Sequence, residues 1–191
     1  MSAAEEPKAA KRADARRNER ALLDAAAAVF VTHGVDAPVR RIAAEAGVGM
    51  GTIYRHFPKR ADLVAAVYRH QVDACAEAGP ELLATAPSPF AALRQWVELF
   101  VDFLVTKHGL AAALRNDPEG FTALHGLFVD RLVPVLDDIL TAARKSGEVK
   151  AEIGAYQLLR AIGDISAGAE MTDPAYDARL TVRLLLDGCR V

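Results

Sequence analysis

The chain has little of what marks a secreted, membrane-spanning or metal-binding protein. Its 191 residues include only two cysteines, Cys75 and Cys189, which are too few for a disulfide framework and show no metal-ligand spacing. Apolar stretches are short and interrupted by charges, so none is long enough to cross a membrane. Residues 1–17 are polar and lack the apolar centre of a secretory signal. We expect a cytoplasmic protein with reduced thiols, no metal site and no membrane partner.

Enzyme signatures are also missing. The histidines are scattered without an H-E-x-x-H pair, and neither G-x-S-x-G nor C-x-x-C occurs. The glycines of "AEAGVGMGTIYRHF" have the spacing G-x-G-x-G, which departs from the dinucleotide fingerprint, and no Gly-Lys-Ser/Thr tripeptide follows. The sequence therefore predicts neither an enzyme nor a cofactor. A purely helical adaptor remains as an alternative class.

Strand signals are nearly absent, whereas helical periodicity extends along the whole chain. Apolar residues make up 52% of it, which suits a packed core. We predict an all-α fold of about nine helices. They are expected at residues 14–33, in the short segments "VRRIAAEA" and "MGTIYRHF", from about residue 59, and at 90–106, 109–115, 121–146 (kinked at Pro134), 155–168 and 176–188. The prolines of "GPELLATAPSPF" predict a bend or linker.

A short helix, a glycine turn and a second short helix over residues 38–57 have the arrangement of a helix-turn-helix. Gly47 stands where the chain reverses direction, a position that favours positive φ. Ile53 and Phe57, with Val48, are spaced to anchor the second short helix against Ile42. The residues expected on or near its exposed side are Met50, Gly51, Thr52, Arg55 and His56.

These exposed groups suit a DNA surface. Gly51 would let the helix backbone approach the duplex, and the hydroxyls of Thr52 and Tyr54 can donate to phosphates. For Tyr54 we expect a packed ring with its hydroxyl facing a phosphate. Arg55 can donate to O6 and N7 of guanine together.

Charge is distributed unevenly along the chain. Residues 1–70 carry 12 Lys and Arg against 8 Asp and Glu, whereas the remainder carries 11 against 17. This basic excess coincides with the helix-turn-helix, which DNA binding explains and an adaptor does not. We divide the chain into a disordered basic arm (1–13), a helix-turn-helix domain (14–60) and a helical body (61–191). Arg16 and Arg17 lie close enough to the first helix to reach a phosphate.

The segment "APVRRIAAEAGVGMGTIYRHFPKRADL" resembles the DNA-binding segment of the TetR family of bacterial transcriptional regulators. The resemblance covers residues 17–65 and rests on the pattern R-x-I-A-x-x-A-G-V-x-x-G-T-x-Y-x-H-F. It implies that the third helix docks in the major groove, with Thr52, Tyr54 and His56 holding the DNA backbone.

Further phosphate contacts are implied by the same resemblance. They fall on Arg40 and Arg41 and on Lys59 or Arg60. Two positions depart from the family: Ala37 stands where Ser or Thr often caps the second helix, and Gly49 where a serine often caps the third. These departures should weaken the phosphate contacts or transfer them to backbone N–H groups at the helix starts.

The resemblance also implies that the body pairs two copies through its last two helices. The expected apolar seam comprises Ile162, Ile165, Leu180, Leu184 and Leu185, although an intramolecular core explains the same stripe equally well. The implied function is a ligand-responsive regulator, most simply a repressor that binds a palindromic operator as a dimer and is released by a small molecule.

Family pockets lie among the middle helices. The candidate lining residues are Trp96, Phe100, Phe103, Leu124, His125 and Phe128, each of which could equally be ordinary core. If they line a cavity, its ligand should be a mostly apolar small molecule with one or two hydrogen-bonding groups.

Overall fold

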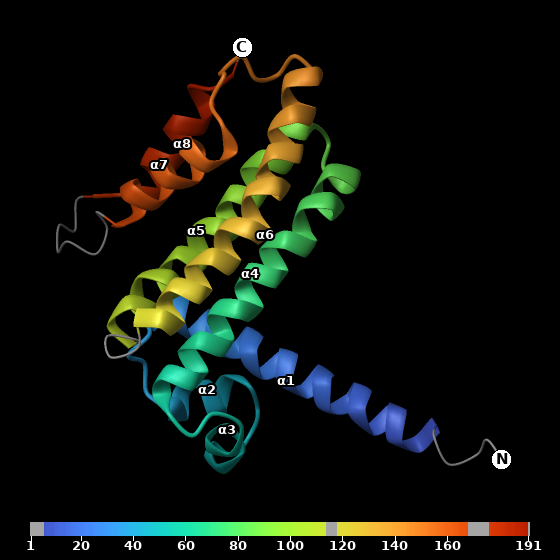
Figure 1. The fold of residues 1–191 in the computed structure, drawn as a ribbon, viewed down its shortest axis with the longest axis vertical. Helices are drawn as coiled ribbons and strands as arrows, with labels where there is room; N and C mark the ends of the chain where they lie inside the picture. The colour runs from blue at the N-terminus through green and yellow to red at the C-terminus, as the bar shows by residue number, and fades with distance from the viewer. Residues whose placement is uncertain (1–5, 114–117, 168–175, 191) are drawn as a thin grey trace.

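The computed structural model describes residues 6–113, 118–167 and 176–190, and these form eight helices with no strand among them (Figure 1). The helices are α1 (Glu6–His33), α2 (Val39–Glu45), α3 (Met50–His56), α4 (Arg60–Thr85), α5 (Pro89–Ala113), α6 (Pro118–Lys145), α7 (Ala155–Ala167) and α8 (Ala178–Asp187). The expected all-α fold is confirmed.

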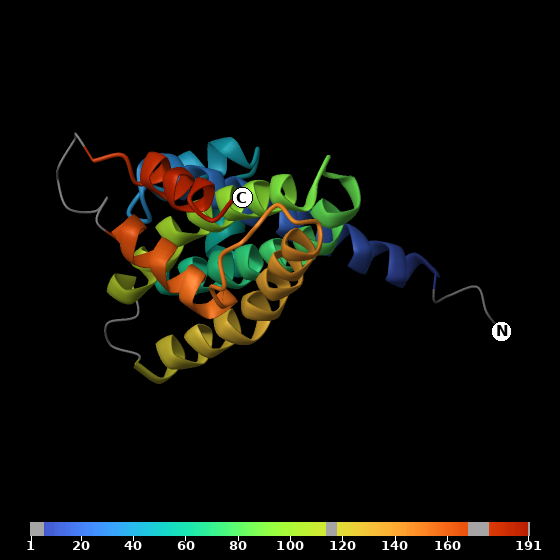
Figure 2. The same ribbon diagram turned by 90° about the horizontal axis from the view of Figure 1, so that it is seen from above.

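Three long helices, α4, α5 and α6, pack against one another along the length of the molecule. The α7–α8 pair covers one side of them, and α2 and α3 lie at the opposite end (Figure 1). Seen from above, the first turns of α1 extend away from everything else (Figure 2). The second half of α1 contacts α2, α4 and α5, so it joins the small N-terminal unit to the body.

Aromatic side chains fill the centre of the body. Trp96 stacks on Phe100 at 5.7 Å between ring centroids, and Phe100 stacks on Phe128 at 5.9 Å. The buried polar atoms of this cluster are paired: Trp96 Nε1 donates to the carbonyl of Cys75 at 2.8 Å, and the Tyr68 hydroxyl donates to a carbonyl of α6 at 3.1 Å. Burial of one such side chain stabilises the fold by about 1.5–3 kcal/mol.

Several expected boundaries were wrong. Helix α1 begins at Glu6, so residues 6–13 are helical and not a disordered arm. Helix α5 runs without a break to Ala113, so two expected helices are one. Helix α4 continues through Pro80 to Thr85, where we expected a bend. Gly79, the residue before this proline, faces α6: a Cβ on it would lie 2.2 Å from Cγ1 of Val135, so the glycine allows α4 and α6 to approach closely.

Both thiols of the chain are free and buried, and burial raises the pKa of each. Among the described residues, no group of His, Cys, Asp or Glu side chains is arranged to hold a metal ion. None of the described helices has the length and apolar character needed to cross a bilayer.

Candidate nucleic-acid interface

Two glycines in left-handed conformations set the course of the chain around α2. Gly34 has φ +75° and ends α1, and its N–H donates to the carbonyl of Phe30 at 2.8 Å. Gly47 has φ +64° in the turn between α2 and α3, which confirms the positive φ expected there. Because other residues adopt this conformation at a cost, these glycines fix the angle between the helices.

The inner face of α3 is anchored as the sequence predicted. Ile53 and Phe57 are buried, Val48 packs against them in part, and Ile42 of α2 is fully buried in the same cluster. Phe30 of α1 completes this small core. The fixed inner face determines which side chains of α3 face outward.

The outer face of α3 is open to solvent. Met50 and Tyr54 are 52% and 53% exposed, and Gly51, Arg55 and His56 are also exposed, while Thr52 is half-buried. We expected the Tyr54 ring to be packed, and this was wrong: Tyr54 is among the exposed large apolar residues of the described chain. An exposed aromatic and methionine beside a guanidinium form a surface that protein packing does not explain.

The packing and backbone conformation of the protein do not require a glycine at position 51. The φ of Gly51 is not positive, and a Cβ built on it would meet nothing within 4 Å. The same holds for Gly49, which lies at the start of α3 in an extended conformation and has no side chain to cap the helix. Because positions 49 and 51 have no side chains, the backbone at the start of α3 can approach an external surface closely.

The basic residues around α3 divide into exposed and internal ones. Arg40, Arg41 and Lys59 are exposed. Arg60 is half-buried instead: its guanidinium donates to the carbonyl of Val35 and lies 5.1 Å above the Phe30 ring. Burial lowers the pKa of Arg60, with the charges of nearby groups opposing this. Of the two candidates for the phosphate contact, Lys59 is the exposed one, whereas Arg60 holds the turn before α2 against α4.

The remaining expected contacts lie at the edge of this surface. Arg17 is exposed and forms an ion pair with Asp14 one turn earlier in α1. The side chain of Arg16 lies outside the described residues. Arg41 Nη1 lies 3.3 Å from His33 Nε2, which links α2 to the end of α1.

Most of the expected ligand-pocket residues are core. Trp96, Phe100, Phe103 and Leu124 are buried in the aromatic cluster. His125 and Phe128 do line a cavity of about 340 Å³, which lies between α5, α6 and α7. Its other lining residues are Lys107, Tyr156, Leu159, Arg160, Gly163, Asp164 and Ala167. We call it the α7 cavity.

Charge at the α7 cavity is mostly positive. Lys107 Nζ lies 4.1 Å above the Phe128 ring, and Arg160 pairs with Asp164 at 3.3 Å. Burial, followed by the charges of Lys107 and Arg160, lowers the pKa of His125, which favours the neutral imidazole.

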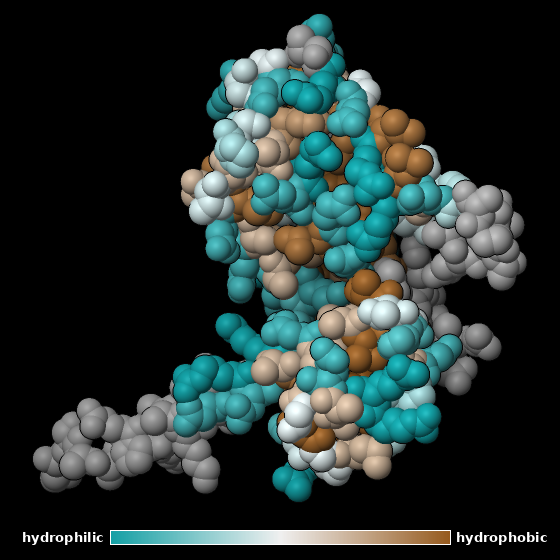
Figure 3. Space-filling view, turned by 180° about the vertical axis from the view of Figure 1, so that it is seen from behind, coloured by the Kyte–Doolittle hydropathy of each residue, from teal (hydrophilic) through white to brown (hydrophobic). Residues whose placement is uncertain are grey.

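The expected dimer seam is only partly at the surface. Ile162 is fully buried in the chain's own core, so its assignment to a seam was wrong. Ile165 and Leu185 are half-buried and pack on that core. Leu180 and Leu184, one turn apart on α8, are 48% and 63% exposed. Figure 3 shows apolar surface at the edge of the body on the side of α7 and α8.

Two short helices joined by a glycine turn, with an anchored inner face and an exposed outer face flanked by basic residues, define a helix-turn-helix DNA-binding protein. Comparison with known proteins gives the family. Residues 22–67 match the family model "Bacterial regulatory proteins, tetR family", and residues 88–191 match "Transcriptional regulator SbtR-like, C-terminal domain". The chain belongs to the TetR family of bacterial transcriptional regulators and is a DNA-binding protein, not an enzyme.

Individual relatives agree with this assignment. A TetR transcriptional regulator from Streptomyces coelicolor is 35% identical with a TM-score of 0.71, over 91% of this chain and 98% of that one. The HTH-type transcriptional repressor LfrR of Mycolicibacterium smegmatis is 42% identical over 86 residues, which are 45% of each chain. The solved complex of LfrR from Mycobacterium smegmatis with proflavine is 25% identical with a TM-score of 0.58, over 93% of this chain and 98% of that one. The aligned segments span less than half of the curated relatives' lengths.

Proposed function

We propose that the protein is a repressor that binds a near-palindromic operator as a homodimer and is released by a small molecule. The proposal that the protein reads DNA rests on the outer face of α3. Gly51, Tyr54 and Arg55 are exposed there, and the packing of the chain does not account for this combination of residues. In this proposal α3 lies in the major groove and Arg55 reads a guanine. Thr52, Tyr54, His56 and Lys59 hold phosphates, which fix the position of α3 on the duplex.

Dimerisation is supported by the exposed leucines of α8. Leu180 and Leu184 share one face of a ten-residue helix that lies at the edge of the body. Large apolar side chains that are exposed together mark interaction surfaces. A second copy seated on this face would present two α3 helices, which should read half-sites about 34 Å apart, one turn of DNA. Because bacterial DNA is the partner, we place the protein in the cytoplasm.

We assign the releasing ligand to the α7 cavity. Its volume of about 340 Å³ suits a small effector, and its position against α7 would let a ligand act on the helices of the proposed dimer. Lys107 and Arg160 outnumber Asp164 there, so we expect a mostly apolar ligand that is neutral or anionic and accepts hydrogen bonds. Proflavine, bound in the LfrR structure, is a cation, and we expect this cavity to bind it poorly.

Selection of bound sites from a random duplex pool at physiological salt tests the operator proposal. We expect recovery of a near-palindrome with half-sites one turn apart. The double variant Leu180→Glu, Leu184→Glu should be monomeric by sedimentation and should bind this site at least tenfold more weakly, because one half-site contributes only part of the contacts. Recovery of single, unpaired half-sites by folded protein would contradict the dimeric reading.

A further inference from the structure

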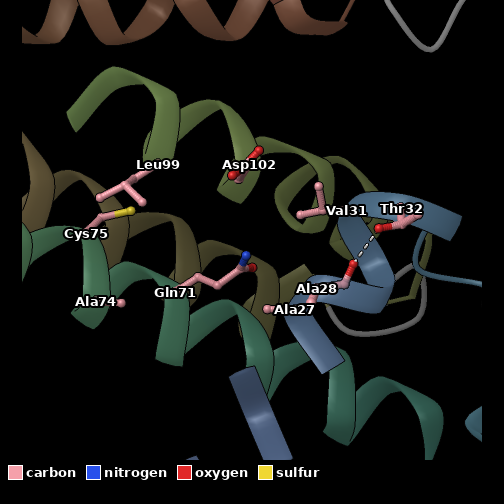
Figure 4. Close-up of a pocket in the computed structure, with 9 residues that line it drawn as sticks. All are labelled: Ala27, Ala28, Val31, Thr32, Gln71, Ala74, Cys75, Leu99 and Asp102. Atoms are coloured by element: carbon pink, nitrogen blue, oxygen red, sulfur yellow. Dashed lines mark hydrogen bonds between the residues drawn. The ribbon is translucent and has the colours of Figure 1, made fainter. Parts of the chain in front are cut away.

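A second cavity lies where the DNA-binding unit meets the body. It has a volume of about 420 Å³, and α1, α4 and α5 contribute its walls (Figure 4). The lining residues are Ala27, Ala28, Val31, Thr32, Gln71, Ala74, Cys75, Leu99 and Asp102. We call it the α1 cavity. It shares no lining residue with the α7 cavity.

Its walls are mostly apolar, and their polar groups are the Thr32 hydroxyl, the Gln71 amide, the Cys75 thiol and the Asp102 carboxyl. Gln71 extends from α4 towards α5, between Cys75 on one side and Ala27 on the other (Figure 4). Its Oε1 atom is buried and accepts no hydrogen bond from any residue that the structure describes. A buried acceptor without a donor is destabilising, because it loses its hydrogen bonds to water and gains none in the protein. A ligand that donates a hydrogen bond to it would remove part of this destabilisation.

The other polar groups at this cavity do not compete for Gln71. The Thr32 hydroxyl donates to the carbonyl of Ala28 at 2.9 Å, as Figure 4 shows. Burial, followed by the charge of Asp102, raises the pKa of the Cys75 thiol to about 12, so this thiol keeps its proton, which it does not donate to Gln71 Oε1. The carboxyl group of Asp102 accepts from Arg179. The unmet requirement of the cavity is therefore a donor, which is opposite to that of the α7 cavity.

The position of the α1 cavity connects it to DNA binding. Thr32 in its wall directly precedes His33, whose ring lies 3.3 Å from the guanidinium of Arg41 on α2. On the opposite wall, Asp102 is bound by Arg179 of α8, which also binds Glu98 at 3.0 Å. The α1 cavity is therefore connected through the end of α1 to the base of the helix-turn-helix.

We propose that the α1 cavity is a second small-molecule site, which takes an apolar compound with an N–H or O–H donor for Gln71 Oε1 and thereby changes operator affinity. A ligand that fits only one spacing of α1 against α4 and α5 shifts the protein towards that spacing. Its effect on DNA is the difference in its affinity for the two spacings. The proposal rests on DNA binding and is independent of the effector assigned to the α7 cavity.

N-phenyl-1-naphthylamine is a suitable probe, because it is apolar, has one N–H donor and becomes fluorescent in apolar surroundings. It would be titrated into the full-length wild type and two matched variants, Ala74→Trp and Ala167→Trp. Both replace an exposed helical alanine, one at the mouth of the α1 cavity and the other at the α7 cavity. We expect Ala74→Trp to weaken probe binding about tenfold or more, since an indole occupies the site, and Ala167→Trp to change it less than about twofold.

Gln71→Leu removes the acceptor without blocking the cavity, and it decides the outcome if Ala74→Trp does not fold. Loss of one hydrogen bond should weaken probe binding about two- to tenfold. Saturating probe should also change the operator affinity of the wild type by about threefold or more, and should leave that of Ala74→Trp unchanged. The proposal is overturned if the probe does not bind, if Ala167→Trp alone abolishes its binding, if Gln71→Leu binds it as tightly as the wild type, or if operator affinity is unchanged.

Discussion

The DNA-binding unit exposes an aromatic residue and a glycine on α3, whereas the body buries and packs residues of both kinds in its core. In the body, Trp96 and Phe100 are 0% exposed and their rings stack, whereas Tyr54 on α3 is 53% exposed. A Cβ on Gly79 would clash with Val135 of α6, whereas one on Gly51 would meet nothing. The body therefore uses aromatic rings and a glycine for internal packing. The exposed ring and glycine of α3 have no internal use, which points to an external partner.

The largest effect should come from the aromatic core. Phe100→Ala removes a fully buried ring and should lower the free energy of unfolding by about 3–5 kcal/mol. Tyr54→Ala should change it by less than about 0.5 kcal/mol, because the ring is exposed. Urea unfolding followed by circular dichroism measures both. Similar losses from the two substitutions would mean that Tyr54 is packed after all, and the contrast between the regions would fail.

Substitutions at Gly51 and Gly79 test the same difference between the two regions. Gly51→Val should fold normally and lose operator affinity by about 100-fold, since a branched side chain holds α3 away from the groove and removes base contacts. Gly79→Val should lower the free energy of unfolding by about 1–3 kcal/mol through overpacking against α6. Fluorescence anisotropy with labelled operator and thermal melting separate the two effects. Tight operator binding by Gly51→Val would show that this backbone does not approach DNA.

Lys59 and Arg60 are neighbours with different expected roles. Arg60→Met should lower the free energy of unfolding by about 1–2 kcal/mol, because the Val35 carbonyl loses its donor and Phe30 its cation. Lys59→Met should leave stability unchanged, weaken binding to all DNA alike, and reduce the salt dependence by about one phosphate contact. Affinities measured over a series of salt concentrations test this. A reduced salt slope in Arg60→Met, with unchanged stability, would reverse the two assignments.

The smallest effect should be a pH dependence in the body. Glu148 accepts from the Ser88 hydroxyl at 2.7 Å and from the Phe90 N–H at 3.1 Å at the start of α5. These bonds hold the pKa of Glu148 below its ordinary value. Its contribution to stability is therefore present above the unfolded-state pKa near 4.5 and is lost as the pH falls through the lower folded-state value.

Urea unfolding of the wild type and of Glu148→Gln between pH 6 and pH 3 measures this contribution. The stability difference between the two proteins should shrink on acidification. A difference that stays constant over this range would show that ionisation of Glu148 does not matter.

The fold of the DNA-binding unit was readable from sequence because its signals are local. Glycines at 34 and 47 mark the ends of α1 and α2, and the inward spacing of Ile53 and Phe57 fixes the orientation of α3. Arg60 was harder to place. Its partners, Val35 and Phe30, lie at least 25 residues away in sequence, so only the folded chain shows that this guanidinium is occupied.

In the body, periodicity predicted helices but not their breaks or their cavities. Gly79 and Pro80 indicated a bend, yet both lie inside α4, where Gly79 packs against Val135 of α6. Of the aromatic residues that suggested a pocket, Trp96, Phe100 and Phe103 are packed core, whereas Phe128 lines the α7 cavity. The polar residues at the two cavities, Lys107 in one and Gln71 in the other, gave no sequence signal, because each cavity forms only where separate helices meet.

The central claim is that the outer face of α3 reads DNA sequence, and Arg55→Ala tests it most directly. Wild type and variant would be titrated with the selected operator and with a shuffled duplex at the same salt concentration. The account predicts that the variant loses about 1–3 kcal/mol of discrimination between the two duplexes while binding the shuffled one nearly as the wild type does. Equal losses on both duplexes would contradict it, because Arg55 would then be only a phosphate contact.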